Sequence, residues 1–225
     1  MAQVEALERQ PDAYSIGGLT LRGAFGIFVG TFSARVVLAL VGIVVIARIA
    51  AGGWRWADLV AVGVVAAAQP FVEWVLHVTV LHWRPKKLGR FTFDPLVARR
   101  HRQHHRDPKV IGLVLVPRSV LIGLIVENAI ITWLATPTWR VGLTAAATSY
   151  VILLAYEWTH FLIHSSYRPR GWYYRSIHRA HRLHHFRNEN YWFGVTINVA
   201  DHVLRTFPEK DTVPVSATAA TLGVE

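Results

Sequence analysis

The chain has 225 residues, an apolar fraction of 52%, a mean hydropathy of +0.30 and a formal net charge of +10. It contains no cysteine, which excludes thiolate zinc sites, cysteine-ligated iron–sulfur clusters, thiolate-ligated haem and disulfides. Long apolar stretches alternate with strongly basic ones, a pattern typical of a polytopic membrane protein. This topology and the attraction of basic loops to anionic headgroups explain the charge, so we expect no nucleic acid partner.

Four apolar stretches are long enough to cross a bilayer, which takes about 20 helical residues. The predicted spanning helices cover about 24–50, 56–82, 110–135 and 141–164, and Pro117 interrupts the third. Short turns join the first to the second and the third to the fourth. The sequence therefore predicts an all-α integral membrane protein built from two helical hairpins.

Lysine and arginine gather on one side of the predicted bundle. Residues 84–109 hold nine of the 24 and residues 168–210 hold eight, whereas the two opposite loops contribute only Arg55 and Arg140. By the positive-inside rule the basic segments are cytoplasmic, and an even number of crossings places both termini there. We expect a multi-pass protein of the cell membrane of a bacterium.

The chain is interpreted as a single membrane-embedded domain over residues 1–210. The last stretch, 211–225, is small and polar apart from scattered valines. We expect it to form a flexible C-terminal tail.

Ten of the twelve histidines fall into four short clusters, two of which have the same pattern, HxxHH. The clusters are His77/His82, His101/His104/His105, His160/His164 and His181/His184/His185. Residues three and four apart lie on one face of a helix, so three of these clusters can each direct their imidazoles the same way. His77 and His82 are five apart, and we therefore expect their helix to end or loosen between them.

Clustered histidines of this kind predict a metal site, because protonated imidazoles would repel one another whereas a metal takes them neutral. Ten imidazoles are too many for one four- or six-coordinate ion. They divide naturally between two ions that each keep a vacant position, where a small molecule can be activated. Imidazole suits iron, zinc, copper and nickel, so the ligand type does not choose the metal.

The order of the four clusters resembles the integral-membrane fatty acid hydroxylase and sterol desaturase superfamily. Within it, the stretch 156–164 (YEWTHFLIH) and the FGV sequence at 193–195, followed by Asp201, are similar to the fatty acid 2-hydroxylase branch. The similarity covers about residues 70–210. It corresponds to the catalytic domain only, without the fused cytochrome b5-like domain of many relatives.

The resemblance implies a helical cap on the cytosolic side of the four helices that holds two metal ions, with the ten clustered histidines as their ligands. The implied metal is iron, with zinc possible in isolated protein, and the implied reaction is hydroxylation of a lipid acyl chain by O2. Electrons then come from an external donor, either a cytochrome b5-like protein or a ferredoxin with its reductase. His178 and His202 have no counterpart in the pattern, so we expect them at the surface or beside the ligands.

Two carboxylates and four aromatic residues are candidates for supporting roles. Glu157 and Asp201 are candidates to accept an imidazole N–H, and helix capping or a salt bridge is an equal alternative. The other candidates are predicted either to line the path of an apolar chain or to anchor the protein at the membrane interface: Tyr156, Trp158, Trp192 and Phe193.

Two alternatives share the fold: a carotenoid hydroxylase, which the sequence AHRLHH at 180–185 resembles, and a sterol-type desaturase or hydroxylase. A membrane metal transporter or sensor is the non-enzymatic alternative. It would place carboxylates and histidines at the middle of the membrane, next to a low-complexity histidine loop. The sequence has neither feature.

Overall fold

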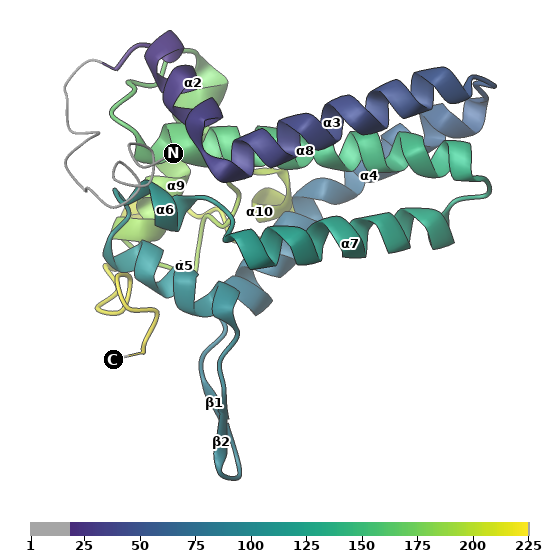
Figure 1. Cartoon of the computed structure of the whole chain (residues 1–225). Helices are drawn as coiled ribbons and strands as arrows, with labels where there is room; N and C mark the ends of the chain where they lie inside the picture. The colour runs from purple at the N-terminus through teal and green to yellow at the C-terminus, as the bar shows by residue number, and fades with distance from the viewer. Residues whose placement is uncertain (1–18, 225) are drawn as a thin grey trace.

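The computed structural model describes residues 19–224; residues 1–18, which include the N-terminus expected in the cytoplasm, and residue 225 lie outside the described part. Four helical segments are long and apolar enough to cross a membrane, and they lie side by side in an elongated bundle (Figure 1). They are α3 (Phe32–Ala51), α4 (Trp56–Leu76) with its continuation η2 (His77–Leu81), the segment Ile111–Ala135, and α8 (Trp139–His164). Helix α8 packs against α3, α4 and α7 (Arg118–Ala135) and so forms the centre of the bundle.

The first predicted span is two helices rather than one. Helix α2 (Leu21–Gly30) ends where Thr31 adopts an extended conformation, with φ −74° and ψ 155°. The Thr31 hydroxyl donates to the Phe28 carbonyl at 2.7 Å and accepts from the Ala34 N–H at 3.4 Å, which closes α2 and caps α3. The expectation of one continuous helix over 24–50 was wrong, because a capping residue inside the apolar run redirects the chain.

The other predicted interruptions are confirmed. Pro117 precedes the first residue of α7 and separates it from the short helix α6 (Ile111–Val114). Between His77 and His82 the helix widens into a π-turn, with the His82 N–H donating to the His77 carbonyl at 3.1 Å. A single π-turn inside an α-helix adds one residue to the turn and commonly marks a functional site.

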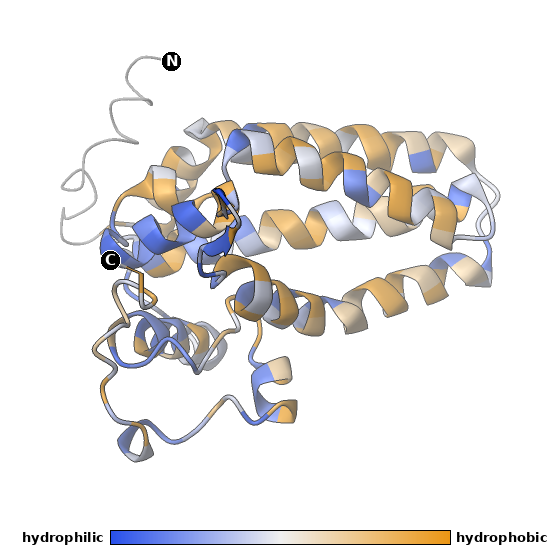
Figure 2. Cartoon of the chain, turned by 90° about the horizontal axis from the view of Figure 1, so that it is seen from below, coloured by the Kyte–Doolittle hydropathy of each residue, from blue (hydrophilic) through white to orange (hydrophobic). Residues whose placement is uncertain are grey.

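Polar helices form a cap at one end of the bundle, where Figure 2 shows hydrophilic residues in place of the hydrophobic ones of the long helices. The cap contains α5 (Leu96–Arg106), α9 (Trp172–Phe186) and α10 (Val199–Val203). A two-stranded antiparallel hairpin, β1 (Lys86–Leu88) with β2 (Phe91–Phe93), projects beside it (Figure 1). The all-α prediction is therefore confirmed for a mostly helical fold, and the small hairpin is an addition to it.

The C-terminal segment packs on the cap. After the short 3-10 turn η3 (Lys210–Thr212), Val213, Ala219 and Leu222 are buried. This differs from the flexible tail expected from composition. The small side chains that suggested flexibility allow the backbone to approach the cap closely, and the contacts are made by backbone carbonyls, the Ser216 N–H and the Thr218 hydroxyl.

A buried polar cluster joins three helices at the end of the bundle remote from the cap. Arg48 of α3 donates to the Asp58 carboxylate of α4 at 2.8 Å and to Thr144 Oγ1 of α8 at 2.7 Å. Arg48 and Asp58 are almost completely buried. Because each charge has a partner, the cluster fixes how α3 and α4 meet α8 without leaving a buried charge unpaired.

Candidate metal centre

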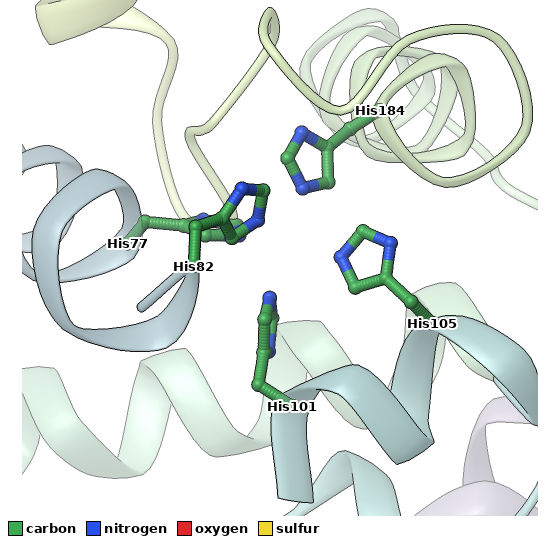
Figure 3. A group of neighbouring side chains, drawn as sticks. All are labelled: His77, His82, His101, His105 and His184. Carbon is green, nitrogen blue, oxygen red and sulfur yellow. The ribbon is translucent and has the colours of Figure 1, made fainter. Parts of the chain in front are cut away.

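The ten clustered histidines gather in the cap as two groups of five. In each group the possible ligand atoms all lie within 4.8 Å of one another. The first group is His77, His82, His101, His105 and His184, and the second group is His104, His160, His164, His181 and His185. Figure 3 shows the rings of the first group converging on a common centre.

The two HxxHH motifs are divided between the groups. Helix α5 gives two histidines to the first group and one to the second, whereas α9 gives one to the first and two to the second. The remaining pairs come from η2 and its end for the first group and from α8 for the second. The sequence left this partition open, because spacing shows which rings share a helix face but not which rings meet across helices.

The π-turn explains how His77 and His82 serve the same group. Because its hydrogen bond spans five residues, the turn carries both rings to one side of the helix, with their centroids 5.0 Å apart. A regular α-helix would direct them to different faces.

Backbone carbonyls fix the tautomer of three rings in the first group. The Nδ1 atoms of His77, His184 and His105 lie 2.7, 2.8 and 2.8 Å from carbonyl oxygens of residues 193, 191 and 219. A carbonyl can only accept, so each Nδ1 carries the proton. The Nε2 atom of each ring is then a bare lone pair, which is the form that binds a metal.

All five Nε2 atoms of the first group are buried without a hydrogen-bond partner among the described residues. Unpaired buried polar atoms are costly, and five directed at one point are not explained by packing. A cation at that point would give all five buried Nε2 atoms a partner, so the side chains present fit a metal ion.

The second group has short contacts between ring nitrogens. His181 Nε2 lies 3.0 Å from both His164 Nε2 and His185 Nε2. One ring nitrogen holds either a proton or a lone pair, so it cannot make two good hydrogen bonds of this kind at once. Nitrogen ligands about 2.1 Å from one ion and at right angles are about 3.0 Å apart, which matches this arrangement.

Burial keeps the cap histidines neutral. It lowers the pKa of His101, His104, His181, His184 and His185 well below the ordinary value, and neighbouring histidines lower these pKa values further. Burial also lowers the pKa of His105 to about 4. Near neutral pH these rings therefore have the protonation state that a metal ion requires.

Glu157 does not touch a histidine in the described structure. Its carboxylate accepts from Ser33 Oγ at 2.6 Å and from the Val116 N–H at 2.9 Å. It therefore ties α8 to α3 and to the segment before α7, one turn from His160. The described bonds of Glu157 include none to an imidazole, and they hold the surrounding helices together.

Asp201 reaches the first group through the backbone rather than directly. It accepts from the N–H groups of Phe193 and Gly194 at 3.0 and 2.7 Å and from Thr206 Oγ1 at 2.6 Å. The Phe193 carbonyl is the acceptor for His77 Nδ1. The loop is tight, since a Cβ at Gly194 would lie 2.9 Å from the Asp201 carboxylate.

Glu73, like Asp201, holds the backbone of the loop after α9, and the sequence analysis missed it. It is buried one turn before His77 and accepts from the N–H groups of Val195 and Thr196. It thus holds the loop that carries the Phe193 carbonyl. The sequence did contain a signal for Glu73, because it is a carboxylate inside a predicted membrane span. A charged side chain there costs free energy and usually has a function.

The four aromatic candidates differ in position. Phe193 lies against the rings of His77 and His184, with centroids 5.5 and 5.3 Å apart, and Tyr156 lies 5.7 Å from the ring of His160. These two side chains therefore border the histidine groups.

The two tryptophans belong to packed clusters. Trp158 stacks on Phe161 and contacts Phe28 of α2. Trp192 is fully buried in a cluster with Ala180 and Val213. Both positions point to structural packing instead of the substrate path.

The two remaining histidines lie outside both groups, as the sequence pattern predicted. His178 is half-buried beside the Tyr174 ring, and the exposed His202 packs on Phe207 with ring centroids 4.2 Å apart.

A cavity of about 830 Å³ lies where the bundle meets the cap. Apolar and basic side chains from α3, α5 and the α6–α7 segment line it, among them Phe32, Leu96, Leu115, Arg99 and Arg100. Ser33 and Val116 also line it, and both donate to Glu157. None of the four aromatic candidates lines this cavity.

The chain is similar to known proteins in the part that contains the histidines. Residues 62–206 match the family model described as fatty acid hydroxylase. The Arabidopsis thaliana dihydroceramide fatty acyl 2-hydroxylase FAH2 is 29% identical over 141 residues, which is 61% of this chain and 56% of the relative. The Homo sapiens fatty acid 2-hydroxylase is 27% identical over 143 residues, which is 62% of this chain and 37% of the relative.

The similarity extends to a solved structure, full-length Scs7p, in which only the hydroxylase domain is visible. The TM-score is 0.64 at 23% identity, with 95% of this chain and 80% of that chain covered. This likeness shows a shared fold. The matched region spans about half of the plant relative and less of the human one.

Proposed function

Because this chain belongs to the fatty acid hydroxylase family, we propose that it is an O2-dependent dimetal hydroxylase of a lipid acyl chain, with a reaction like that of the fatty acid 2-hydroxylases. One observation carries the proposal. Two groups of five histidines lie at one end of a bundle of span-length helices, and the first group has all five Nε2 atoms buried and without a hydrogen-bond partner in residues 19–224.

Iron is the proposed metal, with zinc as the ion that isolated protein can hold instead. Two irons held by the two groups would supply the oxidising chemistry: with two electrons and two protons from outside, one oxygen atom of O2 would enter a C–H bond to give an alcohol and the other would leave as water. The protein holds ten neutral imidazoles in place and keeps the centre buried. Phe193 and Tyr156 give the acyl chain apolar contacts beside the two groups.

The cavity between bundle and cap supports a lipid substrate. It combines apolar side chains with Arg99 and Arg100, as an amphipathic molecule requires. Ser33 and Val116 connect its wall to Glu157, one turn before His160. We place the lipid in this cavity, with its chain directed toward the histidine groups.

The lysines and arginines around the cap support a cytoplasmic location for it by the positive-inside rule. On that side an external donor, a cytochrome b5-like protein or a ferredoxin with its reductase, supplies the electrons. The proposed location is the cell membrane of a bacterium.

Lipid profiling of cells with and without the gene tests the proposed function. We expect an acyl lipid heavier by one oxygen, which disappears in the His104→Ala and His184→Ala variants and persists in the control His202→Ala. A product lighter by two hydrogens instead indicates a desaturase, and altered carotenoids with unchanged acyl lipids indicate a carotenoid hydroxylase. Unchanged lipids with altered cellular metal content would contradict an enzyme and favour a transporter or sensor.

A further inference from the structure

We propose that the C-terminal segment, residues 211–224, is a positioning element of the first histidine group and controls how tightly that group holds its ion. The proposal rests on the two-metal site but not on the reaction assigned to it. It acts through one backbone atom, the carbonyl oxygen of Ala219, which lies 2.8 Å from His105 Nδ1.

The contact between Ala219 and His105 is enclosed. His105 is 2% exposed and Ala219 is 7% exposed. Because both groups are buried, water cannot replace the Ala219 carbonyl as the acceptor. Loss of the bond would therefore leave the Nδ1–H of His105 buried and unpaired. The bond also fixes the proton on Nδ1 and directs the bare Nε2 toward the other four rings of the first group.

Backbone contacts attach the segment to the end of α9. The Ser216 N–H donates to the Arg187 carbonyl at 2.7 Å, and Arg187 Nε donates to the Val213 carbonyl at 2.8 Å. Thr218 Oγ1, next to Ala219, donates to the Glu189 carboxylate. These contacts set the position of the Ala219 carbonyl relative to α9.

The segment also reaches α5. Arg106, the residue after His105, donates to the Val224 carbonyl at 2.7 Å. The chain from 213 to 224 therefore connects the two helices that carry the HxxHH motifs.

The two histidine groups differ in how far they depend on backbone carbonyls that follow α9. Three rings of the first group have Nδ1 bonded to carbonyls that follow α9 in sequence, at residues 191, 193 and 219. In the second group the contacts join His164, His181 and His185 to one another and His160 to the backbone of Val114, so none of them comes from the C-terminal segment. Loss of the C-terminal segment should therefore affect one ion and leave the other in place.

The test measures Zn²⁺ bound per chain, and its release to a chelator, in purified full-length protein and in a variant that ends at Pro214. Each is also prepared with the first group disabled (His101→Ala and His184→Ala together) or the second disabled (His104→Ala and His164→Ala together). We expect truncation to weaken Zn²⁺ binding about 10–100-fold where only the first group remains, the range for lost ligand-orienting bonds. Where only the second group remains, truncation should change nothing.

Point variants keep the test valid if the truncated chain does not fold. Thr218→Val removes the bond to Glu189 beside Ala219 and should accelerate release of the first group's ion alone, whereas Val215→Ser, at an exposed position of the same segment, is the matched control. The positioning role would be overturned if Thr218→Val accelerated the release of both ions equally or of neither. It would also be overturned if truncation left Zn²⁺ binding by the first group unchanged or weakened binding by both groups equally. If the expected Zn²⁺ pattern appears but lipids are unchanged in cells, the hydroxylase proposal fails and the positioning role stands.

Discussion

Asp201 acts on the first histidine group through the backbone. Its carboxylate holds the N–H groups of Phe193 and Gly194, and the Phe193 carbonyl in turn holds His77 Nδ1. Glu73 holds the next two N–H groups of the same loop. At the scale of single residues, the ligand geometry therefore depends on carboxylates that touch no ligand.

Replacing Asp201 by Asn tests this indirect role. The amide NH2 of Asn would face one of the loop's N–H donors and leave it buried and unpaired, which costs about 1–3 kcal/mol. We expect a lower thermal midpoint and about tenfold weaker binding of one Zn²⁺ per chain, measured by chelator competition. The exposed Glu209→Gln is the control, and equal binding by both variants would contradict the indirect role.

Gly194→Ala is predicted to disrupt the same loop by size alone. The new Cβ would lie 2.6 Å from the Ile197 carbonyl oxygen, so the backbone must shift and carry the Phe193 carbonyl with it. We expect about 2 kcal/mol of lost stability and a lower metal content per folded chain. At Gly63 a Cβ meets nothing within 4 Å, so Gly63→Ala should keep or slightly raise stability. A metal content in Gly194→Ala equal to that of Gly63→Ala would be evidence against the loop's role.

At the scale of helices, local polar groups decide where a long apolar run changes direction or pitch. Thr31 breaks the first predicted span, and the π-turn at His77–Leu81 widens the second. The residue spacing predicted the second irregularity, because two ligands five apart cannot share a face of an α-helix. It did not predict the first, because a threonine within an apolar stretch is compatible with a continuous helix.

The buried cluster at the far end of the bundle gives a prediction for the helices that it joins. Arg48→Met leaves the Asp58 carboxylate without its cation, and breaking a buried pair in this way costs about 3–5 kcal/mol. We expect a clearly lower unfolding midpoint but an unchanged metal content in the protein that remains folded, because the cluster lies away from the cap. The double variant Arg48→Met with Asp58→Leu should recover much of the loss. A double variant less stable than Arg48→Met would show that the charges themselves are required.

At the scale of the whole molecule, the two histidine groups and the fold are coupled. The histidines of both groups come from η2, α5, α8 and α9, so an ion bound by either group would join several helices. Removing the metal should therefore lower the thermal midpoint, since an ion that binds only the folded state stabilises it. Stripping with a chelator and restoring Zn²⁺ measures this effect, and an unchanged midpoint would contradict it.

The metal-free protein should also lose stability in acid. Burial lowers the pKa of His105 to about 4 in the folded chain, against about 6.5 when unfolded. Between these pH values the unfolded chain binds a proton at His105 that the folded chain does not bind. The free energy of unfolding is therefore highest above pH 6.5 and declines as the pH falls toward 4. Midpoints measured at pH 8, 7, 6 and 5 test the direction, and a midpoint that rises on acidification would refute it.

The sequence by itself determined the four apolar segments, the fatty acid hydroxylase resemblance and the set of ten clustered histidines. These follow from side-chain chemistry and from spacing along a helix, which are local properties. Only the tertiary structure decided how the HxxHH motifs divide between the two groups, that Glu157 holds helices and not imidazoles, and that residues 211–224 reach His105. Each of these depends on contacts between distant segments, and the acceptors of His77, His184 and His105 are backbone carbonyls, which every residue has and which therefore carry no signal in the sequence.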